Sequence, residues 1–202
     1  RSMRAEDAKP NRLIRAREEA VTLIEALGGD RVGLVAFAGT ASVACPLTLD
    51  YSAARLFLDV LDPSYAPVPG TALAAAIRTA NEGFDPKEKR YKVLVIITDG
   101  EDHEGQAEAA ARQAAAEGVV IYTLGVGSGA GAPIPERDER GVERGFKADR
   151  EGKVVTSRLD PLGLSDIARA GGGKYLPVTA EGKEIREIEE RIARMERREV
   201  GS

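Results

Sequence analysis

Three side chains that carry oxygen atoms, Ser2, Thr71 and Asp99, are the best candidates for chemistry in this sequence. Asp99 lies in the run Thr98-Asp-Gly-Glu-Asp102, directly after five apolar residues, Val93 to Ile97. Open α/β sheets place their ligands at acidic turns of this kind, at the carboxyl ends of buried parallel strands. Two hydroxyls and one carboxylate are hard oxygen ligands, suited to Mg²⁺, Mn²⁺ or Ca²⁺. The alternative is a solvated turn in which Asp and Gly only bend the chain.

A site of this kind predicts protein binding rather than catalysis. The metal keeps water or an open position, into which a carboxylate of a partner protein can insert, and no nucleophile or base is needed. A rival function is a metal-dependent hydrolase that uses Asp99 and the water it holds. Hydrolysis needs a general base and a closed pocket, and the sequence indicates neither, so we expect no enzymatic activity. A second rival is a metal-free structural domain.

The composition excludes several other classes of function. The chain has 202 residues and 43% hydrophobic composition, enough for one α/β domain with a proper core. A formal net charge of −4 and a pI near 5.3 argue against nucleic-acid binding. No apolar run approaches the ~20 residues needed to cross a bilayer, so we expect no direct membrane insertion. The opening Arg1-Ser-Met-Arg4 does not predict a signal peptide.

Strands and helices alternate along the chain, which predicts a doubly wound, mostly parallel sheet flanked by helices. Buried strands are expected at 31–38, 93–97 and 119–126, with an edge strand at 41–47 and a short last strand at 174–178. Helices are expected at about 11–27, 51–61, 71–81, 106–117, 161–170 and 181–198. Residues 127–158 interrupt this alternation, and segments 145–149 and 152–156 predict a small β-hairpin within them.

Motifs in three places resemble the metal-ion-dependent adhesion site of von Willebrand factor A domains. These motifs are Ser2-Met3, Pro69-Gly-Thr71 and Thr98-Asp-Gly-Glu-Asp102. Further phrases are similar to membrane-anchored bacterial A-domain proteins of the aerotolerance (Bat) type. These phrases lie at 6–13, 32–38 and 160–168, with the hairpin insertion after Gly131-Ala-Pro-Ile-Pro135.

The resemblance implies a Rossmann-like A domain over residues 1–180, with the insertion at about 133–158 and a charged C-terminal helix at 181–202. It also implies that Ser2, Thr71 and Asp99 are metal ligands, with Asp99 acting through water. The implied partner is a protein that offers a carboxylate, and tetratricopeptide-repeat proteins and MoxR-type AAA+ ATPases are candidates. Because relatives of the Bat type sit between membrane helices, the parent protein is expected in the bacterial inner membrane, with the periplasm as one side it could face.

The sequence departs from the family motif, which is Asp-x-Ser-x-Ser, because the chain begins at the fourth position of that motif. The motif Asp, its first Ser and the preceding strand, which is central in the family fold, are expected to be absent. Losing one of two carboxylates weakens the attraction for a cation, and a free N-terminal ammonium near Ser2 repels it. We therefore expect weak Mg²⁺ binding by this chain and stronger binding by a form extended upstream.

Other signals favour structural interpretations. The glycine-rich run Gly125 to Gly131 follows a strand, but a phosphate-binding loop must open a helix, and Pro133 and Pro135 follow instead. The only cysteine, Cys45, is expected to be a buried strand residue. The only histidine, His103, is expected to be exposed beside the acidic turn.

Overall fold

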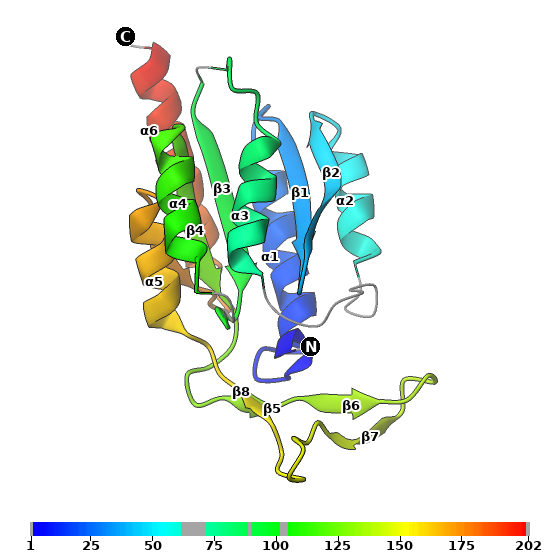
Figure 1. Ribbon diagram of the computed structural model, residues 1–202. Helices are drawn as coiled ribbons and strands as arrows, with labels where there is room; N and C mark the ends of the chain where they lie inside the picture. Colours follow the sequence, from blue (N-terminus) through cyan, green and yellow to red (C-terminus); the bar gives the residue numbers. More distant parts are fainter. Residues whose placement is uncertain (1, 62–71, 89, 102–104, 201–202) are drawn as a thin grey trace.

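The computed structural model describes residues 2–61, 72–88, 90–101 and 105–200 (Figure 1). The main strands are β1 (Val32–Phe37), β2 (Ala41–Thr48), β3 (Lys92–Thr98), β4 (Val119–Gly125) and β9 (Tyr175–Pro177). The helices are η1 (Ser2–Arg4), α1 (Arg12–Ala26), α2 (Tyr51–Asp59), α3 (Leu73–Glu82), α4 (Ala107–Ala116), α5 (Pro161–Ala170) and α6 (Lys183–Val200). Short strands of the insertion are β5 (Ala132–Pro133), β6 (Pro135–Arg137), β7 (Glu143–Phe146) and β8 (Thr156–Ser157).

The strand layer consists of two hydrogen-bonded pieces. β3, β4 and β9 form a parallel sheet in the order β3-β4-β9, with Lys92 opposite Val119 and Thr98 opposite Gly125. β1 and β2 form a separate antiparallel pair. Figure 1 shows the two pieces in one layer, but no strand pairing joins them within the described residues. The α/β architecture with helices flanking a parallel sheet confirms the predicted fold class.

Pairing decides how deeply each strand is buried. β4 has a neighbour on both edges, and six of its seven residues are buried. β1 and β3 are equally apolar, but each pairs on one edge, and most of their residues are only half-buried. The prediction of a buried strand therefore holds for β4 but was wrong for most residues of β1 and β3, because hydrophobic composition does not report which edges are paired.

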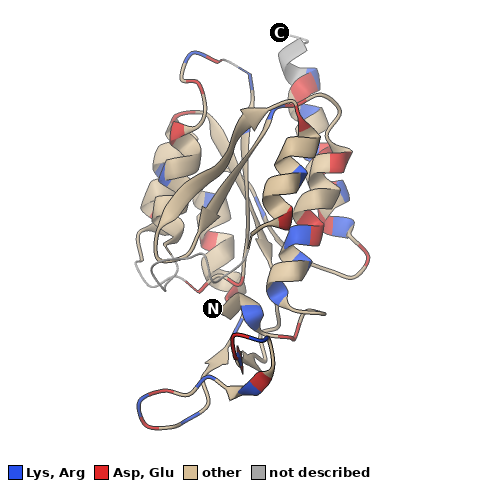
Figure 2. Cartoon of the chain, turned by 90° about the vertical axis from the view of Figure 1, so that its right-hand side faces the viewer, with Lys and Arg blue, Asp and Glu red and all other residues tan. Residues whose placement is uncertain are grey.

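Helices cover both faces of the strand layer (Figures 1 and 2). The alternation of side chains along β3 explains this, since successive residues point to opposite faces. Ile96 packs in a cluster with α3, α4 and α5, and Phe37 of β1 joins that cluster. Val95 and Ile97 pack instead with α6 and with Leu23 of α1. A third cluster joins the same α1, through Ile24, to α2 and β2.

The insertion between β4 and α5 contains two strand pairs in addition to the predicted hairpin. β6 pairs with β7, and β5 pairs with β8. A tight turn nucleates the β6–β7 hairpin, because Asp138 Oδ1 accepts hydrogen bonds from the backbone of Arg140 and Val142. The predicted partners 145–149 and 152–156 also pair, through a bridge between Ala148 and Val154 and through hydrogen bonds from Asp149 N–H to the Lys153 carbonyl at 2.9 Å and from Val155 N–H to the Lys147 carbonyl at 2.8 Å. Asp149 closes this predicted hairpin in the same way, since its Oδ1 accepts from the backbone of Glu151 and Lys153.

Two buried carboxyl groups meet where α6 packs on α1. Glu19 and Glu184 are each 3% exposed. Glu184 accepts hydrogen bonds from the backbone N–H and hydroxyl of Thr179, at 2.9 and 2.8 Å. The Oε2 atom of Glu19 has no partner in the described residues, although Arg15 forms an ion pair with Oε1. Burial raises the pKa of Glu19 to about 7, with Glu184 and Glu18 adding to the rise and Arg15 opposing it.

This raised pKa predicts a loss of stability as the pH rises. The folded protein holds the Glu19 proton more tightly than the unfolded chain, whose glutamate has a pKa near 4.5. The stability that protonated Glu19 provides is therefore fully present below about pH 4.5 and is lost as the pH rises through about 7. We expect Glu19→Gln, which cannot ionise, to raise the unfolding free energy at pH 8 by on the order of 2 kcal/mol, and much less at pH 5.

Urea denaturation at both pH values measures this difference. Glu25→Gln, on the same helix and exposed, is the control and should change stability equally little at both. An equal effect of Glu19→Gln at pH 5 and pH 8 would contradict the prediction.

Candidate metal site at the carboxyl ends of the strands

The carboxyl ends of β3 and β4, the N-terminal segment and the base of the insertion gather at the lower end of the molecule (Figure 1). The turn after β3 is held by backbone hydrogen bonds. Asp160 N–H donates to the carbonyl of Asp99 at 2.9 Å, and Val126 N–H donates to that of Thr98 at 2.9 Å. Gly100 has φ +82°, and a Cβ there would lie 2.9 Å from Leu164 Cγ, so the turn requires glycine.

The carboxylate of Asp99 is 1% exposed, and its two oxygens have different surroundings. Oδ2 accepts a hydrogen bond from Arg12 Nη1 at 3.0 Å. Oδ1 has one contact among the described residues, the backbone N–H of Glu101 at 3.4 Å, near the limit for a hydrogen bond. One oxygen is thus firmly held, and the other retains capacity to accept a further ligand.

Arg12 itself is fully buried, and each of its five N–H donors is satisfied. Nε and Nη2 donate to the two carboxylate oxygens of Asp7, both at 2.8 Å. Nη1 donates to Ser157 Oγ at 2.6 Å as well as to Asp99, and Nη2 also donates to the Ser157 carbonyl at 3.1 Å. Asp7 in turn accepts from the backbone N–H and hydroxyl of Ser128, at 2.8 and 3.1 Å. We call these five residues the Arg12 network.

The electrostatics of the Arg12 network favour a cation. Burial alone would raise the pKa of Asp7, but hydrogen bonds and charge from Arg12, with the hydrogen bonds from Ser128, outweigh burial and lower that pKa to about 2. Burial would lower the pKa of Arg12, but Asp7 and Asp99 outweigh burial and raise it, so the guanidinium stays charged. Two carboxylates and one guanidinium give a formal charge of −1 at a buried position.

The structure describes two of the three predicted ligands, Asp99 and Ser2. Asp99 lies at the carboxyl end of β3, as predicted. Ser2 is half-buried in η1, where its carbonyl accepts from Ala5 N–H, and no described hydrogen bond joins it to Asp99. Thr71 lies outside the described residues, and so do Asp102 and His103. The ligand set Ser2, Thr71 and Asp99 therefore stays a prediction.

The donor chemistry sets a limit on the kind of metal site. Within the described ranges, no group of three or more His, Cys, Asp or Glu side chains is arranged to hold a metal ion. The free oxygen of Asp99 and the residual negative charge fit a cation that takes its other protein ligands from hydroxyls. They do not fit a cluster of three acidic ligands.

Sequence reasoning missed Arg12, Asp7, Ser157 and Ser128. Arg12 and Asp99 are 87 residues apart, and no local spacing joins them. The one available signal was the pair of opposite charges Asp7 and Arg12 on either side of Asn11, whose side chain caps α1 by accepting from Ile14 N–H. A fully paired arginine at the first position of a helix differs from the solvated face that helical charges usually form.

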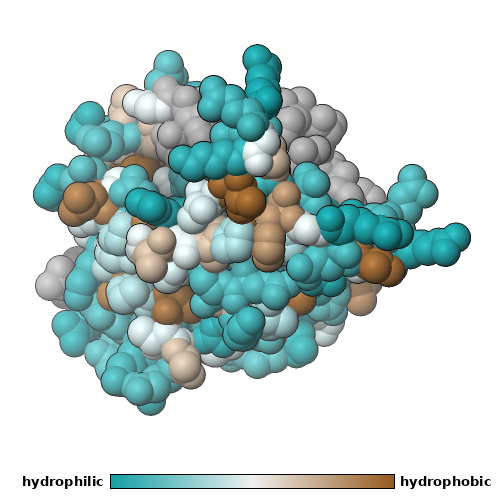
Figure 3. Space-filling view, turned by 90° about the horizontal axis from the view of Figure 1, so that it is seen from below, coloured by the Kyte–Doolittle hydropathy of each residue, from teal (hydrophilic) through white to brown (hydrophobic). Residues whose placement is uncertain are grey.

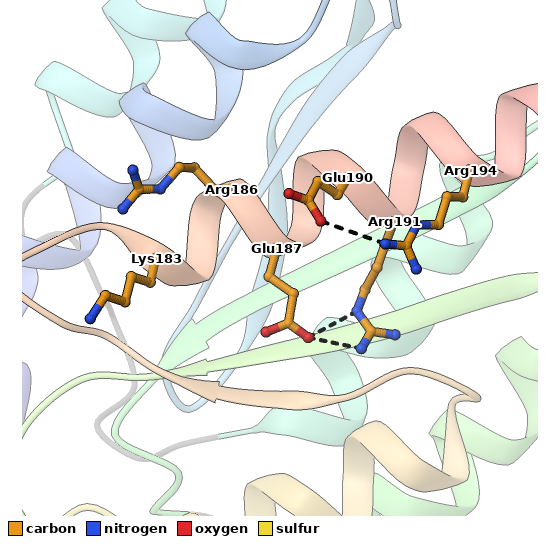
Figure 4. Close-up of a pocket in the computed structure, with 6 residues that line it drawn as sticks. All are labelled: Lys183, Arg186, Glu187, Glu190, Arg191 and Arg194. Atoms are coloured by element: carbon orange, nitrogen blue, oxygen red, sulfur yellow. Dashed lines mark hydrogen bonds and ion pairs between the residues drawn. The ribbon is translucent and has the colours of Figure 1, made fainter.

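A surface hollow lies away from this site, along α6 (Figure 4). Its lining comes entirely from that helix: Lys183, Arg186, Glu187, Glu190, Arg191 and Arg194. Glu187 and Glu190 form ion pairs with Arg191 and Arg194, one helical turn away. The hollow is the charged outer face of α6 and holds no arrangement of nucleophile and base.

Two competing signals have structural explanations. Cys45 is buried in β2, as predicted, and burial raises the pKa of its thiol. The glycine-rich run leads into β5 rather than into a helix, so it cannot present helix N-terminal amides to a phosphate.

A parallel sheet covered by helices on both faces, with an acidic turn after one strand, is the arrangement of the doubly wound, Rossmann-like α/β class. The family model described as von Willebrand factor type A domain matches residues 1–101. The chain belongs to this family.

Within the family the chain is similar to the Bat type. BatB from Bacteroides thetaiotaomicron is 38% identical, with a TM-score of 0.90 over 97% of this chain and 94% of that one. An aerotolerance-related membrane protein from Bacteroides fragilis is also 38% identical, with a TM-score of 0.89 over 96% and 94%. The UPF0353 protein of Mycobacterium ulcerans is 32% identical over 68% of this chain and 47% of that protein. The chain thus spans about half the length of the curated relatives it matches.

No helix in the described ranges combines the length and the apolar character that crossing a bilayer requires.

The close packing of Gly127 on Arg12 generates a stability prediction. Gly127 has φ +116°, and a Cβ there would lie 2.5 Å from Arg12 Nε. Gly127→Ala combines backbone strain with displacement of a fully bonded buried arginine, so we expect a loss of more than about 2 kcal/mol of unfolding free energy.

Gly129→Ala is the matched control, because a Cβ there meets nothing within 4 Å and the backbone lies outside the left-handed region. We expect that variant to stay within about 0.5 kcal/mol of the wild type. Chemical denaturation of both variants is the measurement, and equal stability of the two would contradict the role given to Gly127.

Proposed function

We propose that this chain is a protein-interaction domain that engages its partners through a divalent cation at the carboxyl ends of the strands, without catalysis. Membership of the von Willebrand factor type A family supports this, because these domains commonly mediate metal-dependent protein interactions. The observation that carries the proposal is the Asp99 carboxylate, which is buried, held firmly on Oδ2 and weakly contacted on Oδ1.

The proposed metal ligands are Ser2, Thr71 and Asp99, and the proposed cation is Mg²⁺, with Mn²⁺ or Ca²⁺ as alternatives. Hydroxyl and carboxylate oxygens suit these hard cations. When bound, the cation would supply an open position for a carboxylate of the partner. Asp99 contributes the charge, and Arg12 and the backbone of Glu101 hold its carboxylate.

The surface around the site supports polar recognition. Seen from below, this end of the molecule is mostly hydrophilic, and its hydrophobic side chains lie in small separate groups (Figure 3). The insertion carries both signs of charge (Figure 2), and its exposed apolar residues Val142, Phe146 and Val154 are each about half exposed. A partner that offers a carboxylate to a cation fits such a surface better than one that offers a broad apolar face.

The whole protein is proposed to be anchored in the bacterial inner membrane. The similarity to an aerotolerance-related membrane protein and to BatB supports this, together with curated relatives of which this chain covers about half. Tetratricopeptide-repeat proteins and MoxR-type AAA+ ATPases are the proposed partners.

A metal-free structural domain is the second candidate. The observation that favours it is the Arg12 guanidinium, which already provides Asp99 with a cationic partner at 3.0 Å. In that case the acidic turn stabilises the fold through the Arg12 network and has no further ligand.

Calorimetric titration with Mg²⁺ and Mn²⁺ separates the two candidates. We expect the wild type to bind weakly and Thr71→Ala and Asp99→Asn to lose at least about tenfold in affinity, because the first removes a hydroxyl ligand and the second removes the negative charge. Asp149→Asn is the control, since this residue accepts turn hydrogen bonds from Glu151 and Lys153 in an exposed part of the insertion. Circular dichroism checks that each variant is folded.

A wild type that binds neither cation would overturn the metal-dependent function and leave the structural domain. Unchanged affinity in folded Thr71→Ala and Asp99→Asn would show that the cation binds elsewhere.

A further inference from the structure

We infer that Arg12 is a positioning residue of the metal site, which holds the carboxylate of Asp99 in place and ties it to the base of the insertion. This inference rests on the proposed function, because it gives Arg12 a role toward the cation that Asp99 is proposed to bind.

The geometry of the guanidinium leaves it one orientation. Its Nε and Nη2 atoms form a two-point contact with Asp7, both at 2.8 Å, which fixes the plane of the group. In that plane Nη1 reaches Asp99 Oδ2 at 3.0 Å and Ser157 Oγ at 2.6 Å. The side chain is fully buried, so water cannot replace any of these partners. The position of the Asp99 carboxylate is therefore set by an atom of a different element, α1.

The same group closes the base of the insertion. Ser157 lies in β8, at the end of the insertion, and accepts from Arg12 through both its hydroxyl and its carbonyl. Ser128 lies at the beginning of the insertion and donates to Asp7. The two ends meet directly, because Leu159 N–H donates to the Ser128 carbonyl at 3.1 Å.

The tip of the insertion also contacts the N-terminal segment, where Arg137 donates to Glu6 at 2.8 Å. A displacement of the insertion therefore disturbs bonds of Arg12 and Asp7, and through Arg12 it reaches Asp99. Cation binding at Asp99 and protein contact with the insertion are coupled in this arrangement, and such coupling acts in both directions.

In Arg12→Lys, the lysine side chain separates the effect of side-chain geometry from the effect of charge. It carries the same charge as arginine but cannot form a planar two-point contact with Asp7 while reaching Asp99 and Ser157. If Arg12 only competed with the metal for Asp99, loosening it would tighten cation binding. If Arg12 positions Asp99, loosening it weakens cation binding, so the direction of the change decides between the two roles.

The experiment is a Mg²⁺ titration of the wild type, Arg12→Lys, Ser157→Ala and the double variant, each checked for folding by circular dichroism. We expect Arg12→Lys to weaken Mg²⁺ binding about 10–100-fold, as other supporting residues of metal ligands do. Ser157→Ala should weaken binding by a few-fold, and the double variant should bind no more weakly than Arg12→Lys alone, because Ser157 acts through Arg12. Arg17→Lys, on the same helix with an exposed partner in Asp59, is the control.

Unchanged or tighter Mg²⁺ binding by folded Arg12→Lys would overturn the inference, and losses that simply multiply in the double variant would overturn the link to the insertion. If Arg12→Lys does not fold, Ser157→Ala decides alone, and unchanged affinity in it overturns the inference.

A second measurement needs no metal. Amide hydrogen exchange in the metal-free protein should speed up at both 98–101 and 157–160 in Ser157→Ala and in Arg12→Lys, and not in Arg17→Lys. If the wild type binds no Mg²⁺, the proposed function fails. Amide hydrogen exchange then tests the positioning role by itself. Unchanged exchange at 98–101 in Ser157→Ala and Arg12→Lys would overturn that role.

Discussion

The packing around Asp99, at the carboxyl ends of the strands, depends on one buried cation, the guanidinium of Arg12. An uncompensated charge in this position would be costly, since water is excluded and the surroundings have a low dielectric constant. Compensation is complete because Asp7, Asp99 and Ser157 accept all five donors. Three chain segments that are distant in sequence are thereby joined at a single point, the N-terminal segment, the turn after β3 and the end of the insertion.

A buried ion network of this kind is weak evidence for stability alone. Well-packed apolar residues of similar volume are often as stable, so the geometry of the network is the more informative property. Among the described residues, that geometry leaves Oδ1 of Asp99 with one contact at 3.4 Å while Oδ2 is bound. A network that only stabilised the fold would be more stable with both oxygens of Asp99 firmly hydrogen-bonded. The unequal bonding of the two oxygens is therefore the feature of this packing that supports a cation at Asp99.

The sequence could predict what is encoded over short distances. The apolar run at 93–97 predicts β3, and the alternation of strands and helices predicts the α/β class, because both patterns arise from neighbouring residues. Asp99 could be singled out because it directly follows such a run. Arg12 could not, because its partner is 87 residues away and only the assembled fold joins them. For the same reason the half-burial of β1 and β3 was missed, since it depends on which strands pair.

The division of the strand layer determines how its two pieces are held together. A continuous sheet is stiff because hydrogen bonds cross from each strand to the next, but among the described residues none cross between the β1–β2 pair and the β3-β4-β9 sheet. The halves are held together by side-chain packing, with α3 contacting Phe37 and Ile96 on one face and α1 bridging two clusters on the other. These two helices pack against strands on both sides of the division, which lies where the family fold is expected to have its central strand.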